Sequence, residues 1–165
     1  MKLLSDLNDR LTKIEGGLVV VLIGIMMILA FFQVVLRSVF SSGFVWADIL
    51  LRHMVLWIGF LGGALATSKQ RHIHIDALAH YVGPRVRAAL GVFTNLFGAA
   101  VCAALTVASI RFVEGEIQAE SMFYERIPSW YAQIIIPVGF SLHVIHFLIR
   151  SVLSAREVME KEAAA

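Results

Sequence analysis

The chain has 165 residues, of which 59% are hydrophobic and 16% are charged, and its formal net charge at pH 7 is +2. Its mean hydropathy of +0.80 corresponds to more apolar surface than a soluble domain of this size can bury. The composition therefore excludes an ordinary soluble domain and predicts a single all-α integral membrane domain over residues 1–165. The one cysteine, Cys102, excludes an intrachain disulfide and argues against a cysteine-based metal site.

The first 36 residues contain a short amphipathic pattern followed by a long apolar run. Leucines and Ile14 recur at helical spacing with charged residues between them, which predicts a helix over about 2–14 that lies at the membrane surface. A solvated tail is the alternative for so short a pattern. Residues 16–36 are interrupted only by Gln33, and at about 1.5 Å per residue they can cross a hydrocarbon core of about 30 Å. We expect the first span there.

The second span, about 44–67, carries the most unusual residues of the chain. Asp48 and Arg52 lie one helical turn apart on one face, and in the glycine-rich part that follows (Gly59, Gly62 and Gly63) the glycines at 59 and 63 fall close to the same stripe. Lipid tolerates buried charge poorly, and small residues let helices approach closely. We therefore predict that this stripe contacts another protein, through the following residues: Trp46, Asp48, Arg52, Gly59, Gly62 and Gly63.

The second half of the chain predicts two more spans. A short apolar face over about 75–82 is too short to cross a bilayer, so we expect an interfacial helix that ends at Gly83-Pro84. The third span covers about 88–110 and is followed by an acidic segment that can continue the helix out of the membrane. The fourth covers about 130–149, with Trp130 as an interfacial anchor and a kink at Pro137.

Lys and Arg are distributed asymmetrically about these four spans. Three lie on one side (Arg37, Arg111 and Arg126), and ten lie on the other (Lys2, Arg10, Lys13, Lys69, Arg71, Arg85, Arg87, Arg150, Arg156 and Lys161). Because positive charge accumulates in cytoplasmic loops, we expect both termini in the cytoplasm and the acidic segment outside. Asp48 and Arg52 then lie in the outer half of the second span.

Arg52 lies about 12 Å inside its span, where an unpaired charge costs a few kcal/mol. Asp48, one turn away, is the nearest candidate partner, which gives a purely structural interpretation of the pair. The alternative is a substrate or ion path, but no other span carries an Asp or Glu that could complete a relay. A small multidrug exporter is excluded by the same observation, since such exporters need an acid in the first span.

The histidines raise two further alternatives. His53, His143 and His146 lie within spans, as in four-helix membrane anchors that hold haem between two helices. The expected depths of His53 and His143 differ by roughly 6 Å at helical rise, which argues against a shared haem. His72 and His74 share a face but lack a third ligand, so interfacial contacts are favoured over a metal site. No catalytic motif is present, and we expect neither an enzyme nor a nucleic-acid-binding protein.

Several short motifs, taken together and in order, are similar to a known family. They are RSVF (Arg37 to Phe40), Trp46-Ala47-Asp48, Arg52, Phe60-Leu61-Gly62, His72 with Ile73, Asp76, Pro84, Ile127-Pro128-x-Trp130 and Ile136-Pro137-x-Gly139-Phe140. The chain resembles the four-helix small membrane subunit of tripartite ATP-independent periplasmic (TRAP) transporters. One departure is that members often have two adjacent acids after the tryptophan, whereas Ile49 follows Asp48 here.

The resemblance implies a multi-pass protein of the bacterial inner membrane that transports nothing alone. Its expected partners are a large membrane subunit, a periplasmic substrate-binding protein and membrane lipids. The large subunit would import an organic acid, of the dicarboxylate or sialic-acid type, with sodium that binds to it rather than to this chain. Arg37, His72, Asp76, Pro84, Trp130 and Pro137 would serve interfacial or structural roles, and no cofactor is implied. The haem-containing redox anchor is the alternative.

Overall fold

The computed structural model describes residues 2–69, 84–124 and 127–163. The described residues form long helices with one small hairpin: α1 (Lys2–Phe40), α2 (Val45–Lys69), α4 (Pro84–Gln118), β1 (Met122–Tyr124), β2 (Ile127–Pro128), α5 (Trp130–Gln133) and α6 (Ile135–Ala163). The two short strands pair antiparallel. Apart from this hairpin and the short loops, the described residues are helical, which confirms the predicted all-α fold class.

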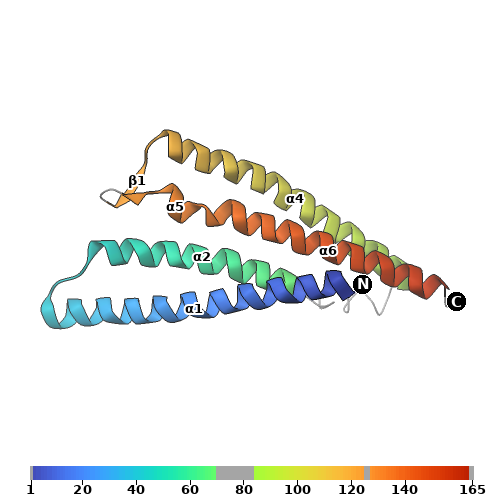
Figure 1. Ribbon diagram of the computed structural model, residues 1–165, viewed down its shortest axis with the longest axis horizontal. Coiled ribbons are helices and arrows are strands. Elements are labelled where there is room, and N and C mark those ends of the chain that lie inside the picture. The colour runs from blue at the N-terminus through green and yellow to red at the C-terminus, as the bar shows by residue number, and fades with distance from the viewer. Residues whose placement is uncertain (1, 70–83, 125–126, 164–165) are drawn as a thin grey trace.

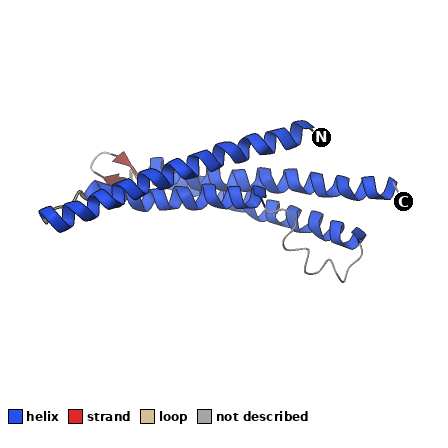
Figure 2. Cartoon of the chain, turned by 90° about the horizontal axis from the view of Figure 1, so that it is seen from below, coloured by secondary structure: helices blue, strands red, loops and turns tan. Residues whose placement is uncertain are grey.

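Four helices are long and apolar enough to cross a membrane, over Asn8–Phe40, Val45–Ser68, Ala89–Gln118 and Trp130–Ala155. This confirms the prediction of four spanning helices. α1 packs on α2, α2 on α6 and α6 on α4. The two termini lie at one end of the bundle, and the α1–α2 loop and the strand hairpin lie at the other (Figure 1). Figure 2 shows the same arrangement from below.

Three helices differ in length from the expected spans. α1 is continuous through Gly16, so the structure has one 39-residue helix in place of the expected surface helix and separate span. α4 continues to Gln118, in agreement with the expected extension through the acidic segment. α6 continues to Ala163, well beyond the expected end of the fourth span at about 149. The residues beyond 150 are mostly good helix formers without Gly or Pro, so the helix persists after the apolar run ends.

The expected kink at Pro137 is a break slightly upstream. α5 ends at Gln133 and α6 begins at Ile135, which places Pro137 in the first turn of α6. A proline has no N–H and its ring clashes with the carbonyl four residues earlier, so it is tolerated at a helix start and not in a helix interior. The fourth span is therefore two helices joined at Ile134.

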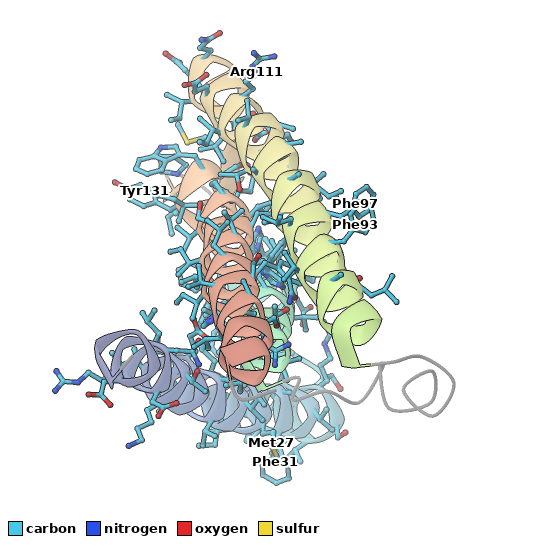
Figure 3. The ribbon with its side chains drawn as sticks, turned by 90° about the vertical axis from the view of Figure 1, so that its right-hand side faces the viewer. Met27, Phe31, Phe93, Phe97, Arg111 and Tyr131 are labelled. Carbon is cyan, nitrogen blue, oxygen red and sulfur yellow. The ribbon has the colours of Figure 1, made fainter. Side chains whose placement is uncertain are left out.

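The outward surface of the bundle is strongly apolar. Met27 and Phe31 of α1 are 64% and 72% exposed, and Phe93 and Phe97 of α4 are 68% and 63% exposed. Figure 3 shows both pairs pointing away from the other helices. In water these side chains would be unfavourable, but in lipid they need no protein cover. This surface is what a membrane-embedded bundle requires.

Some of the predicted features lie outside the described residues. These are the interfacial helix over 75–82 and the residues His72, His74 and Asp76. Pro84 is described as the first residue of α4, where a fixed backbone angle favours helix initiation.

Candidate functional site

A polar network closes the turn between α1 and α2. The Gln33 side chain is 4% exposed; its Nε2 donates to the Phe44 carbonyl at 2.7 Å and to Asp48 Oδ1 at 3.2 Å, and its Oε1 accepts from the Phe44 N–H at 3.2 Å. The Arg37 guanidinium forms an ion pair with the other oxygen of Asp48. Asp48 therefore pairs across the loop with α1, and the predicted local pair with Arg52 is wrong.

The short loop brings Arg37 close enough for this pairing. Ser41 adopts a positive φ of 48°, which turns the chain sharply after α1. A Cβ on Gly43 would lie 3.1 Å from Arg37 Nε, so the absence of a side chain at Gly43 leaves room for the guanidinium. Asp48 is thus paired within the subunit.

Arg52 lies one turn after Asp48 on α2 but takes no part in the Asp48 network. Its side chain is exposed, and among the described residues it makes no hydrogen bond or ion pair. Arg52 nevertheless lies within the apolar stretch Val45–Ser68. A guanidinium in a membrane-spanning segment needs an anion or hydrogen-bond acceptor, and the described residues supply none to Arg52.

Arg52 lies at a groove between α2 and α6. The groove has a volume of about 480 Å³ and is lined by Arg52, Val55, Leu56, Gly59, Phe60, Phe140 and His143. Two of the lining residues, Phe60 and Phe140, have rings that meet edge to face with centroids 5.1 Å apart. The groove therefore combines one cation with walls that are almost entirely apolar.

The three glycines predicted to form one contact surface have different roles. A Cβ on Gly63 would lie 3.1 Å from His143 Nε2, so Gly63 serves the packing of α2 on α6 inside this subunit. A Cβ on Gly59 or on Gly62 would meet nothing within 4 Å. Only Gly59 lines the groove with Arg52. Part of the predicted surface is thus internal, and Arg52 with Gly59 remains outward.

Aromatic residues gather at the end of the bundle that carries the loop and hairpin. Trp46 is 41% exposed and its ring lies 5.8 Å from that of Phe44. Trp130 stacks on Tyr131 with ring centroids 3.9 Å apart, and Figure 3 shows Tyr131 pointing outward. Exposed Trp and Tyr rings are enriched where a membrane meets water, which is the role expected for Trp130.

Each intramembrane histidine is held by the protein itself. His53 Nδ1 lies 2.8 Å from the Ile49 carbonyl, and His143 Nδ1 lies 2.7 Å from the Gly139 carbonyl. Both nitrogens of His146 face oxygens, from Asn8 and Glu15. His146 can therefore ligate a haem iron only by giving up one of these contacts. Within the described residues no group of three or more His, Cys, Asp or Glu side chains could hold a metal ion.

Sequence reasoning missed three polar residues that hold the helices together. Gln33 and Glu15 are nearly buried at 4% and 3% exposure. Trp57 Nε1 donates to the Ala132 carbonyl at 2.9 Å, beside the break between α5 and α6. The sequence positions of two of them could have indicated these contacts. Gln33 is the single polar residue of an apolar run, and Glu15 shares a helix face with Asn8 and Thr12.

Comparison with known sequences identifies a matching family. The family described as "Tripartite ATP-independent periplasmic transporters, DctQ component" matches residues 26–157. This match contains α2, α4, most of α6 and much of the apolar part of α1. It includes every residue of the Asp48 network and of the groove.

Three relatives cover different shares of the chain. A C4-dicarboxylate TRAP transporter small permease protein of Pseudomonas aeruginosa is 25% identical, over 82% of this chain and 79% of the relative. A putative TRAP transporter small permease protein of Haemophilus influenzae is 31% identical, over 61% of this chain and 62% of the relative. A sialic acid TRAP transporter permease protein of Haemophilus influenzae is 31% identical, over 59% of this chain and only 14% of the relative.

Proposed function

Because the chain belongs to the DctQ component family of the tripartite ATP-independent periplasmic transporters, we propose that it stabilises and orients the large transport subunit of an organic-acid importer. The family match and the four apolar helices make it a multi-pass protein of the bacterial inner membrane. In the proposed assembly a periplasmic protein delivers the acid, and the large subunit moves it with sodium. This chain supplies neither the ion site nor the substrate site.

The observation that carries the stabilising role is the groove with Arg52, a cation that has no ion pair among the described residues. Arg52 makes no hydrogen bond or ion pair within the described part of this chain, yet it lies in a membrane-spanning helix beside an open glycine, Gly59. A membrane helix that supplies a carboxylate or a carbonyl to Arg52 and packs against Gly59 would satisfy both features. We assign that helix to the large subunit.

The sialic acid relative supports this assignment. The segment similar to this chain is only 14% of that permease protein, so there it is covalently joined to a much longer polypeptide. In that relative the segment is part of the same polypeptide as the rest of the permease. We infer that this chain binds a separate large subunit in the same way. The names of the relatives give dicarboxylates and sialic acids as the two acid classes to test.

Omitting this chain tests the stabilising role. The large subunit expressed alone should be recovered from membranes in lower yield and should lose its monodisperse behaviour in mild detergent. Reconstituted with the binding protein in liposomes, it should take up the acid only when this chain is also present. Equal yield and equal sodium-driven uptake without this chain would refute the stabilising role, and uptake without the binding protein would refute the tripartite mechanism.

We further propose that both termini are cytoplasmic. The two termini share one end of the bundle (Figure 1), and the Lys and Arg asymmetry assigns that end to the inner side. A reporter that is active only in the cytoplasm should work after Ala165, and one active only in the periplasm should work near Glu120. A periplasmic reporter that is active after Ala165 would contradict this orientation.

A further inference from the structure

The first turns of α1 direct their polar face toward the bundle. Glu15 is 3% exposed, whereas Ile14 beside it is 62% exposed. Asn8 and Thr12 lie on the same face as Glu15, at helical spacing, and are half-buried. An amphipathic helix on the surface of a soluble protein buries the opposite face. The polar stripe must therefore be stabilised by polar partners inside the subunit.

Those partners come from α6 and α2. His146 of α6 is completely buried; its Nδ1 lies 3.0 Å from Asn8 Oδ1, and its Nε2 lies 3.0 Å and 3.2 Å from the two oxygens of Glu15. Thr12 Oγ1 donates to Ser68 Oγ of α2 at 3.0 Å. One turn beyond His146, Arg150 donates from Nη2 to the Ser68 carbonyl. Three helices thus meet at one buried polar cluster.

The hydrogen bonds show which nitrogen of His146 donates. A carboxylate only accepts hydrogen bonds, so Nε2 donates to Glu15. The Asn8 amide has both a donor and an acceptor, so it can pair with Nδ1 whether or not that nitrogen carries a proton. Arg150 is the other charged group of α6 in contact with this cluster, through the Ser68 carbonyl of α2.

We propose that the buried pair of His146 and Glu15, in which Nε2 donates to the carboxylate, is the latch that fixes the first turns of α1 to α6. α1 packs mainly along α2 and has few other contacts with α6, as the path of α1 in Figure 1 illustrates. Without the latch, the α1–α2 hairpin keeps its own packing while the N-terminal turns of α1 separate from α6. The latch is a property of this chain alone, so it does not depend on the proposed partner.

The contact between His146 and Glu15 can be detected directly in the full chain. With ¹⁵N-labelled histidine in lipid bilayers, the His146 signals are identified by their loss in His146→Gln. We expect Nε2 of His146 to carry a proton, and the signal of that proton to shift in Glu15→Gln. His143, one turn away on the same helix, contacts the Gly139 carbonyl through Nδ1, and its signals should stay unchanged in Glu15→Gln. A His146 Nε2 without a proton in the parent chain would overturn the proposal.

A second measurement tests whether the latch holds α1 against α6, by distances between pairs of spin labels on introduced cysteines. Cys102 is first replaced by Ser so that it is not labelled. Spin labels on Arg10 of α1 and Val152 of α6 should give one narrow distance in the parent and a broad distribution in Glu15→Gln and in His146→Gln. Labels on Lys13 and Ala66 should stay narrow in all variants, which distinguishes latch release from unfolding. The exchanged pair Glu15→His with His146→Glu should restore the narrow distance. An unchanged Arg10–Val152 distance in both single variants would overturn the latch.

Discussion

Replacing Gly139 with alanine should destabilise the subunit by about 1–3 kcal/mol, because the added methyl group overpacks the contact between α2 and α6. A Cβ at this position would lie 2.6 Å from Phe60 Cδ1 and 2.8 Å from Phe60 Cβ. The ring could turn away, but the Phe60 Cβ is fixed to the backbone of α2, so the helices themselves must move apart. The midpoint of thermal unfolding in detergent should fall by several degrees.

Gly17→Ala is the matched control for that substitution. A Cβ on Gly17 would meet nothing within 4 Å, and alanine is the better helix former by about 0.5–1 kcal/mol. We expect Gly17→Ala to leave the midpoint unchanged or to raise it slightly. If Gly139→Ala behaves like Gly17→Ala, then α2 and α6 do not pack as closely as the structure indicates.

The number and order of the spanning helices could be predicted because apolar run length is a direct measure of membrane crossing. The residues at which the helices begin and end could not be predicted in this way. α6 continues to Ala163 because nothing in the residues after Arg150 stops a helix, and hydropathy alone does not register that. Pro137 correctly indicates a discontinuity in the fourth span. The break itself lies upstream of Pro137, because the proline ring clashes with the carbonyl four residues earlier.

Pairing of charges was harder to predict than their presence. Asp48 and Arg52 at i and i+4 are an ordinary helical pair, so their spacing favours the local partner. The structure instead pairs Asp48 with Arg37, since the short loop brings the end of α1 against the start of α2. Contacts across a turn depend on backbone geometry, here the positive φ of Ser41, and one sequence does not reveal it.

The buried cluster of Asn8, Glu15 and His146 could not be predicted for a related reason. The spacing within the first fifteen residues indicates an amphipathic helix, which at a membrane surface directs its apolar face toward lipid and its polar face toward water. In a lipid-embedded bundle the polar face can turn inward, where other helices supply partners. Only the position of His146, on α6 and 131 residues away from Glu15, reveals which direction the polar face takes.

The largest effect on assembly should come from the groove between α2 and α6. Leucine at Gly59 would fill the open face of α2 and keep a partner helix at a distance, which removes the close packing that drives association in lipid. Arg52→Ala would remove a charge-assisted hydrogen bond worth about 1–3 kcal/mol, or about a 5- to 150-fold loss in affinity. Uptake by the reconstituted transporter should fall in parallel with recovery of the large subunit.

Both variants should still insert and fold. Neither substitution makes the span less apolar, and a Cβ on Gly59 would meet nothing within 4 Å in the described part of the subunit. Gly63→Leu should behave differently, since it would collide with His143 and disturb the subunit as well as any interface. It is therefore unsuitable as a probe of the partner, although it lies on the same stripe.

The most direct measurement compares two glycine variants on two helices. The tagged chain carrying Gly59→Leu, or Gly17→Leu as control, is purified in mild detergent, and the large subunit recovered with it is quantified at equal amounts of tagged chain. Both glycines are exposed, a Cβ on either would meet nothing within 4 Å among the described residues, and both lie in spanning helices. We predict that Gly59→Leu loses most of the large subunit while Gly17→Leu retains it. Full recovery with Gly59→Leu would contradict the assignment of the groove as the binding surface.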